Sequence, residues 1–214
     1  MSLHFDMADP AERARGLETA VTAARRGDLL VIPTDTVYGI GCDAFSSSGV
    51  ERLLAAKGRG RDMPVPVLLG SPGVIEGLAY GLTKAARELA EAFWPGALTL
   101  VVRHQPSLAW DLGDSRGTVA LRMPLHPVAI ELLRASGPMA VSSANRSGSS
   151  PATTYLEARD QLGDSVAVYL DSGTSGDAVP STIVDVTGQV PHVLRLGAVE
   201  LDTLRSVCPD LTCD

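Results

Sequence analysis

A run of basic residues separated by glycines is the feature of this sequence that most suggests chemistry. In "AAKGRGRDMP", residues 55–64, Lys57, Arg59 and Arg61 occupy alternate positions directly after a helical pattern. Glycine lets the backbone approach a ligand closely, and cations at this spacing can surround a polyphosphate. A solvated basic loop is the competing interpretation, because cations also stabilise a helix C-terminus.

Polar side chains also follow two apolar segments, at the points where buried strands are expected to end. The stretch "PTDTVYGIG", residues 33–41, comes directly after the apolar run 29–32, and "AVSSANRSG", residues 140–148, contains Ser143 and Asn145. Hydroxyl and amide groups can bind a phosphate, a sugar or a carboxylate. Since the same residue types form turns, each stretch taken alone fits a turn as well as a ligand site.

Two arginines follow strand-like segments and stand beside proline or glycine. Arg122 lies in "TVALRMP" and Arg195 in "HVLRLGA". A guanidinium at a strand end can clamp a carboxylate or phosphate through two hydrogen bonds, but it can equally be an ordinary surface group. Ser181, at the start of the apolar segment "STIVDV", adds a hydroxyl that can face the same cavity.

Several common catalytic motifs are absent from the sequence. It has no G-x-x-x-x-G-K-[ST] phosphate loop, no strand followed by G-x-G-x-x-G, and no G-x-S-x-G around the serines of residues 140–148. The four histidines stand far apart, and none pairs with a cysteine or carboxylate at a metal-ligand spacing: His4, His104, His126 and His192. We therefore expect neither a dedicated zinc site nor a hydrolase with a serine nucleophile.

The elements that must position these residues alternate between apolar runs and helical patterns. Apolar runs, expected to be strands covered on both faces, lie at 29–32, 65–69, 98–102, 118–122, 139–142, 166–170 and 182–186. Helices are expected at 49–57, 83–93, 126–136 and 154–162, with a last one near "VELDTLRSV". This alternation predicts an α/β fold with a twisted, largely parallel or mixed open sheet and flanking helices.

A further helix is predicted in "ADPAERARGLETAVTAARRGD". Asp9 can cap it, Pro10 suits its first turn, and Gly27 can end it. The residues expected on its buried face recur every three or four positions: Ala14, Leu17, Val21 and Ala24.

Length and composition fit one globular domain. The chain has 214 residues, of which 45% are hydrophobic and 20% charged, and we interpret residues 1–214 as a single domain with its core at about 10–200. The net charge of −7 opposes stable binding to nucleic acid or membranes. Three cysteines, no leader-like N-terminus and no apolar run long enough to span a bilayer indicate a cytoplasmic protein.

Taken together and in order, these segments resemble the threonylcarbamoyl-AMP synthases of the YrdC-like family. The matching blocks cover about residues 20–200: "PTDTVYGIG", "KGR" followed by a proline, "FWPGALTLV", "TVALRMPLHP", "SSAN", "STIVD" and "LRLGA". The resemblance implies a nucleotidyltransferase that converts L-threonine, bicarbonate or carbon dioxide, and ATP into threonylcarbamoyl-AMP and pyrophosphate. This product serves the N6-threonylcarbamoyladenosine modification of tRNA. The resemblance also implies Mg²⁺ with ATP, with ligands that the sequence does not name, and handover of the product to the downstream tRNA threonylcarbamoyl-transferase machinery.

Carried over to matching positions, the resemblance assigns two groups of ligands. Lys57 and Arg59 would be the catalytic residues, holding the ATP phosphates and stabilising their growing charge. The other ATP ligands would be Arg61, Ser143, Asn145 and Arg195. L-Threonine would lie among Thr34, Tyr38, Arg122 and Ser181. In this arrangement Arg122 is the partner of the threonine carboxylate.

Three features depart from the family pattern. "PVPVLLG" places Leu68 where many members have a histidine, so any contact made by that histidine is lost. Arg61 stands where the family is variable. The chain stops at Asp214 without the additional domain of longer members, so closure of the site is expected from within this domain.

Two other functions remain compatible with the sequence. The first is a double-stranded RNA-binding module, since YrdC-like domains have a concave, positively charged surface, although a net charge of −7 and 4% aromatic residues oppose it. The second is a carbamoyl-adenylate former that acts on another acceptor or uses carbamoyl phosphate. Relatives of that kind usually sit inside much longer proteins, so the short chain favours threonine.

Overall fold

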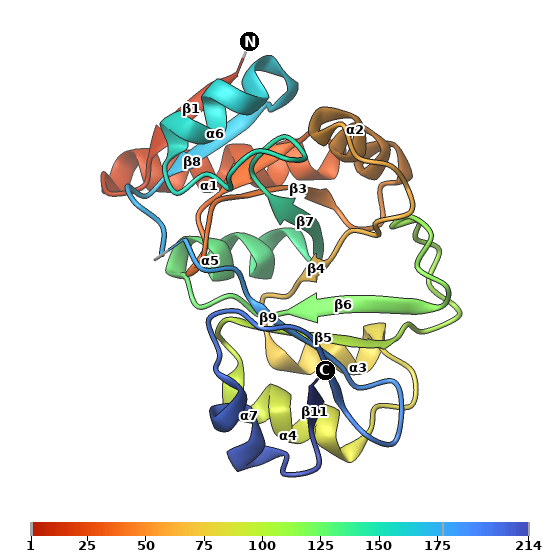
Figure 1. Ribbon diagram of the computed structural model, residues 1–214. Helices are drawn as coiled ribbons and strands as arrows, with labels where there is room; N and C mark the ends of the chain where they lie inside the picture. The colour runs from red at the N-terminus through yellow and green to blue at the C-terminus, as the bar shows by residue number, and fades with distance from the viewer. Residues whose placement is uncertain (1, 177, 214) are drawn as a thin grey trace.

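Eleven strands pair into one sheet in the computed structural model, which describes residues 2–176 and 178–213 (Figure 1). The strand order is β1-β8-β2-β3-β7-β4-β6-β5-β9-β10-β11. Of the neighbouring pairs in these ranges, five are parallel and five antiparallel. The predicted α/β fold with an open sheet and flanking helices is confirmed, and the sheet is evenly mixed.

The order of helices and strands follows the predicted alternation. The strands are β1 (Leu3–Asp6), β2 (Leu30–Ile32), β3 (Gly39–Asp43), β4 (Val67–Leu68), β5 (Leu98–Arg103), β6 (Thr118–Arg122), β7 (Met139–Ser143), β8 (Val168–Asp171), β9 (Thr182–Asp185), β10 (His192–Arg195) and β11 (Thr212–Cys213). The α-helices are α1 (Pro10–Arg25), α2 (Ser47–Lys57), α3 (Ile75–Leu78), α4 (Lys84–Phe93), α5 (Pro127–Ser136), α6 (Tyr155–Leu162) and α7 (Leu201–Val207). Single 3₁₀ turns lie at η1 (Pro72–Val74) and η2 (Gly163–Ser165). Among the described helices, none has the length and apolar character to cross a membrane.

Strands β1, β3, β10 and β11 lie outside the predicted apolar runs, although "HVLR" of β10 is strand-like in sequence. β1 and β11 lie at the two edges of the sheet and carry polar residues. β3 has the sequence "GIGCD", and glycine is a weak strand former. It nevertheless lies inside the sheet, because it pairs in antiparallel register with both β2 and β7. Tertiary pairing therefore decides its conformation.

Helix α1 begins where the sequence predicts, but its buried face is rotated from the predicted one. The Asp9 carboxylate caps it by accepting from two backbone N–H groups of the first turn. Leu17 and Ala24 are buried as predicted and Val21, partly buried, packs against the same core, but Ala14 is exposed. The buried residues are Gly16, Leu17, Ala20, Ala23 and Ala24. Small side chains occupy this face because β1 lies close, and a Cβ on Gly16 would come within 2.9 Å of the Phe5 side chain.

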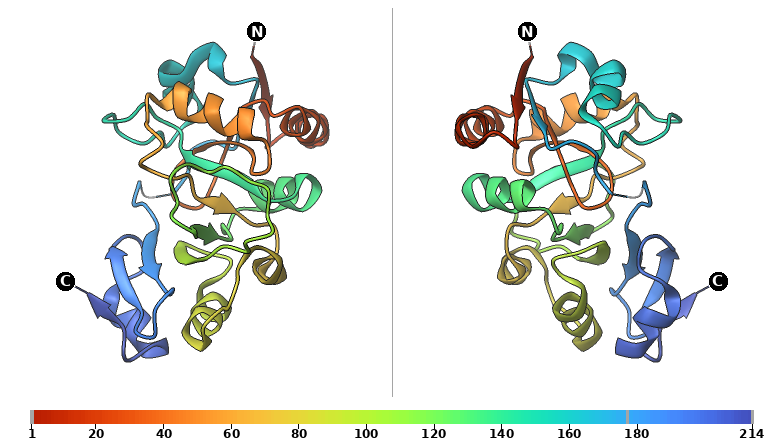
Figure 2. Two further views of the ribbon diagram at one scale, coloured as in Figure 1. Left: turned by 90° about the vertical axis from the view of Figure 1, so that its right-hand side faces the viewer. Right: turned by 90° about the vertical axis from the view of Figure 1, so that its left-hand side faces the viewer.

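Two apolar cores cover the sheet. In β2, Val31 belongs to one core, while its neighbours Leu30 and Ile32 belong to the other, as the alternation of a strand requires. Helices α1 and α5 pack on the core that contains Leu30, and Figure 2 shows them on the same side of the molecule. Helix α2 packs on the core that contains Val31. This arrangement brings the end of α2 to the turn that follows β7.

Candidate active site

Lys57, at the end of α2, lies against the turn after β7. Its Nζ donates to the carbonyl oxygens of Ser143 at 2.5 Å and Asn145 at 2.7 Å, and lies 3.4 Å from Asn145 Oδ1. An ammonium has three N–H donors, so these three oxygens can engage all of them. Burial, and secondly the charge of Arg59, lower the pKa of Lys57 to about 8. Lys57 therefore places a buried positive charge beneath this turn.

Asn145 also helps to build the turn. Its Nδ2 donates to the carbonyl oxygens of Arg146 at 2.9 Å and Ser149 at 2.7 Å. The structure thus brings together Lys57, Ser143 and Asn145, three of the residues predicted to bind ATP. In this structure the polar ends of Lys57 and Asn145 hold the protein backbone.

Arg59 also lies near the turn after β7, and unlike Lys57 it retains N–H donors that make no strong hydrogen bond. Its Nη1 lies 3.3 Å from Ser142 Oγ and its Nη2 lies 3.4 Å from the Pro64 carbonyl oxygen, both long for hydrogen bonds from a charged donor. Its Nε is buried and has no hydrogen-bond partner among the described residues. Because an unpaired buried donor is costly, an anion placed here would be stabilised.

Arg122 ends β6 as the centre of a second polar group. Its Nε donates to the Gly96 carbonyl oxygen at 2.9 Å, its Nη1 to Thr36 Oγ1 at 3.0 Å, and its Nη2 to Asp35 Oδ1 at 2.6 Å. These bonds use three of the five guanidinium N–H groups. One N–H on each terminal nitrogen is left by these three bonds.

Asp35 and Thr36 are the functional residues that sequence reasoning did not select. The Asp35 carboxylate also accepts from the backbone N–H of Leu125 at 3.0 Å. Thr34 Oγ1 donates to the Val37 carbonyl oxygen at 2.6 Å and lies 3.1 Å from Thr36 Oγ1. The available signal was the stretch "PTDT", which places a carboxylate between two threonines directly after a buried strand.

Ser181 and Arg195 lie together at the start of β9 and the end of β10. Arg195 Nη2 donates to the Ser181 carbonyl oxygen at 2.6 Å, and Ser181 Oγ is 2.8 Å from Thr99 Oγ1. The charge of Arg195 contributes to the lowered pKa of Arg122, after burial, which is the largest cause. The structure therefore places Arg195, predicted as an ATP ligand, with the residues predicted for threonine.

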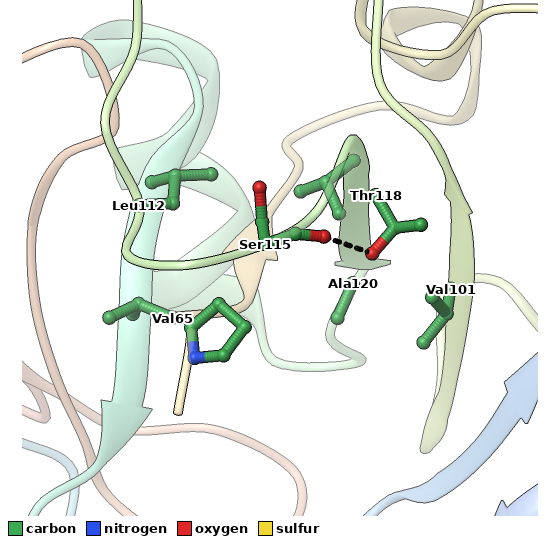
Figure 3. Close-up of a pocket in the computed structure, with 8 residues that line it drawn as sticks. Val65, Val101, Leu112, Ser115, Thr118 and Ala120 are labelled. Atoms are coloured by element: carbon green, nitrogen blue, oxygen red, sulfur yellow. Dashed lines mark hydrogen bonds between the residues drawn. The ribbon is translucent and has the colours of Figure 1, made fainter. Parts of the chain in front are cut away.

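An apolar hollow lies along strands β5 and β6 and the segment before β4 (Figure 3). Its volume is about 80 Å³, and it opens to solvent. Ala120 lines it two residues before Arg122, on the same face of β6, and Pro64 lines it next to Arg59. Its lining residues are Pro64, Val65, Val101, Leu112, Ser115, Thr118, Val119 and Ala120. An apolar site with a few polar groups beside it suits a flat aromatic ring such as a base.

Tyr38 lies apart from the open surfaces of these groups. Its side chain is fully buried, and its hydroxyl donates to the Gly173 carbonyl oxygen at 2.7 Å and accepts from the Ser172 N–H at 2.9 Å. Burial is the main cause of its raised pKa. In this structure Tyr38 fixes the segment after β8 and does not form an exposed wall of a ligand site.

The same segment lies directly over the turn after β2. A Cβ on Gly176 would lie 2.2 Å from the Thr36 carbonyl oxygen, so no larger residue fits there without movement. Thr34, Thr36 and Arg122 are each less than 9% exposed. Residues 172–176, which follow β8, therefore belong to the surroundings of the Arg122 group.

Arg61 and Leu68 lie away from the turn after β7 that Lys57 and Arg59 contact. The Arg61 guanidinium pairs with Asp111 at 2.6 Å and with Asp114 at 3.6 Å. It is thus held by two carboxylates, in contrast to its predicted place on a phosphate. Leu68 is the register partner of Arg122 and packs in the core beneath α5. This position borders the Arg122 group, where the leucine adds an apolar side chain.

Metal ligands do not converge in the described ranges. Within residues 2–176 and 178–213, no three His, Cys, Asp or Glu side chains are grouped to hold an ion. Asp35, the carboxylate at the Arg122 group, is already paired with the guanidinium. The site therefore supplies cations and hydroxyls, and no protein cage of carboxylates.

The fold and these two polar groups define an α/β protein built to hold anionic ligands beside an apolar hollow. Comparison with family models identifies the family to which the chain belongs. The model of the Sua5/YciO/YrdC family, described as "Telomere recombination", matches residues 22–197. The chain belongs to this family, and the resemblance found in the motifs is confirmed.

Relatives and solved structures agree with this assignment. A Mycobacterium tuberculosis protein, provisionally named a threonylcarbamoyl-AMP synthase, is 63% identical over 207 residues, covering 97% of this chain and 95% of the relative. The threonylcarbamoyl-AMP synthase of Bacillus subtilis is 34% identical over 91% of this chain and 57% of its own length. The structure of Pyrococcus abyssi Sua5 complexed with L-threonine is similar, with a TM-score of 0.92 and 31% identity, over 100% of this chain and 62% of that one.

Proposed function

We propose that this protein is a threonylcarbamoyl-AMP synthase. It is a nucleotidyltransferase that joins threonine and a one-carbon unit to the AMP portion of ATP and releases pyrophosphate, for the threonylcarbamoyladenosine modification of tRNA. The observation that carries this conclusion is the arrangement of three features side by side. Arg59, which has unused donors, lies beside the segment that lines the apolar hollow. Arg122 keeps two N–H groups that a carboxylate could accept. The names of the relatives support the same reaction.

The nucleotide occupies the Arg59 side of the site. The apolar hollow takes the adenine ring, and Arg59 with the hydroxyls of Ser142 and Ser143 takes the phosphates. Arg59 Nε, buried and unpaired among the described residues, gains a partner when a phosphate oxygen arrives. Lys57 contributes its charge from beneath the turn that holds Ser143.

Threonine occupies the Arg122 side. The two remaining N–H groups of Arg122 bind its carboxylate as a bidentate pair. Thr34, Ser181 and Arg195 surround this position. The complex of Pyrococcus abyssi Sua5 with L-threonine shows that this relative binds the same amino acid.

The chemistry requires positioning more than a protein nucleophile. The threonine amine forms a C–N bond with bicarbonate carbon and water leaves, which gives a carbamate. A carbamate oxygen then forms a bond to the α-phosphorus, and the bond from that phosphorus to pyrophosphate breaks. Arg59 stabilises the charge that grows on the phosphates, and Arg122 holds the amino acid in line. The residues at the site, which are cations and hydroxyls, match this requirement.

Magnesium and product handover are further parts of this proposal. The donor set around Arg59 contains no carboxylate cage, so we assign magnesium to the phosphate oxygens of ATP, where it would neutralise charge. The product is a mixed anhydride, which water attacks readily. Direct handover to the downstream tRNA threonylcarbamoyl-transferase machinery would protect it.

Pyrophosphate release from ATP and bicarbonate tests the proposal, with L-threonine, L-serine, L-valine or no amino acid. We expect release only with L-threonine and bicarbonate together, and threonylcarbamoyl-AMP among the products. Release that ignores the amino acid would contradict the synthase assignment and favour a carbamoyl-adenylate former with another acceptor. The same assay on Arg59→Ala tests the phosphate contact. Arg13→Ala is its matched control, because Arg13 forms an ion pair with Glu131 on the surface.

A further inference from the structure

One wall of the apolar hollow is formed by residues 105–117, which we call the wall loop. This segment joins β5 to β6 and contributes Leu112 and Ser115 to the lining. Figure 3 shows Leu112 and Val65 on one side of the hollow and Val101 on the other. The backbone N–H of Val65 donates to the Leu112 carbonyl oxygen at 2.9 Å. The shape of the hollow therefore depends on where the wall loop lies.

Arg61 fastens the wall loop at its centre. Its Nη2 donates to Asp111 Oδ1 at 2.6 Å, and its Nε lies 3.6 Å from Asp114 Oδ1. Its carbonyl oxygen accepts from the Asp114 N–H at 2.8 Å. Gly113 allows this approach, since its φ is +101° and a Cβ there would lie 2.8 Å from the Arg61 carbonyl oxygen. Hydrogen bonding from Arg61 lowers the pKa of the Asp111 carboxyl.

A stacked pair of aromatic rings attaches the wall loop at a second point. The Trp110 ring lies 5.6 Å from the Phe45 ring at an interplanar angle of 19°. Phe45 precedes α2, so this contact joins the wall loop to the helix that ends in Lys57. Trp110 is adjacent to Asp111, and its fluorescence can report whether the wall loop is docked.

We propose that Arg61 and Asp111 are positioning residues for the base of the nucleotide. Their ion pair holds the wall loop against the segment after α2, and the loop then completes the hollow beside Arg59. This inference rests on the proposed function, in which the hollow takes the adenine ring. It gives Arg61 a role at the site without contact to phosphate.

Comparing a ligand that has a base with one that lacks it separates the contribution of the base to binding from that of the phosphates. We would measure the affinity of the full chain for ATP and for inorganic tripolyphosphate, at one magnesium concentration, by calorimetry. The variants are Arg61→Ala, Asp111→Asn and the exchanged pair Arg61→Asp with Asp111→Arg. Arg13→Ala, which removes a surface ion pair of similar exposure, is the matched control. Tryptophan emission of each variant reports docking of the wall loop.

The two single variants should bind ATP about three- to fivefold more weakly and tripolyphosphate within about twofold of the original affinity, as expected for an exposed ion pair. The exchanged pair should recover much of the loss, and Arg13→Ala should change neither ligand. An equal loss for both ligands would overturn the proposal and make Arg61 a phosphate ligand. Unchanged affinity for both would also overturn it.

The same titrations distinguish this inference from the proposed function. Wild-type protein that binds ATP no tighter than tripolyphosphate would refute a base site in the hollow and overturn this inference. A clear preference for ATP that weakens in both single variants would support it, even if pyrophosphate release proved independent of threonine. In that outcome the synthase assignment alone would fail.

Discussion

Replacing Asp35 with asparagine removes a negative charge from the guanidinium of Arg122 while leaving an acceptor oxygen in place. The two side chains are 8% and 16% exposed, and their atoms lie 2.6 Å apart. A hydrogen bond to a charged group contributes about 1.5 to 3 kcal/mol, so we expect the free energy of unfolding to fall by about 2 kcal/mol. For a chain of this size, that loss lowers Tm by about 4 to 8 °C.

The same substitution should weaken threonine binding more than ATP binding. Arg122 keeps its bonds to Gly96 and Thr36, but the direction of its Nη2 is no longer fixed by a charged partner. If the loss of this orientation weakens threonine binding by about 1.4 to 2 kcal/mol, KM for threonine rises about ten- to thirtyfold. KM for ATP should stay within about twofold, since Arg59 and the hollow are unchanged.

Pyrophosphate release at varied threonine and varied ATP, with thermal unfolding of the same samples, checks both expectations. Asp28→Asn is the matched control, because Asp28 pairs with Arg26 on the surface at 3.0 Å. A lower Tm with unchanged KM for threonine would refute the orienting role and leave a purely structural one. A lower KM for threonine would show that Asp35 competes with the substrate for Arg122.

Three further substitutions test other parts of the site. Arg59→Ala should reduce turnover about a hundredfold or more, the effect of removing one charge-stabilising donor, and near-normal turnover would contradict its place on the phosphates. Activity should fall as pH rises through about 8, because Lys57 then loses its charge, and Lys57→Arg should flatten this profile. Stability should move in the opposite direction, rising between about pH 8 and 10.5, since the unfolded chain holds the Lys57 proton more tightly. Tyr38→Phe should speed hydrogen exchange at the Ser172 N–H, which loses its acceptor, and lower Tm.

Local sequence determined much of the fold. The apolar runs became strands β2 and β4 to β9, and Asp9 and Pro10 mark the start of α1 as predicted. These features are readable because a helix repeats its contacts every three or four residues, and a strand covered on both faces is continuously apolar. The ordered motifs also identified the family, since they extend over most of residues 22–197.

The rotation of α1 and the presence of β3 were decided by packing. Ala14 fits the helical repeat but is exposed, because Gly16 faces Phe5 of the neighbouring strand β1 in its place. β3 contains two glycines and pairs on both sides with other strands. Neither outcome can be read from local preference, because the partner that decides it is distant in the chain.

The roles of individual cations were likewise a matter of tertiary structure. Arg59 and Arg61 are the same residue type two positions apart, and their spacing predicts the same function for both. The fold places Arg59 beside Ser142, with a buried Nε that lacks a partner among the described residues, and places Arg61 against Asp111. A charged side chain acts through the groups that surround it, and segments far apart in the sequence supply those groups. The sequence by itself therefore determined that cations gather after α2, and only the tertiary structure decided which of them remains open to a ligand.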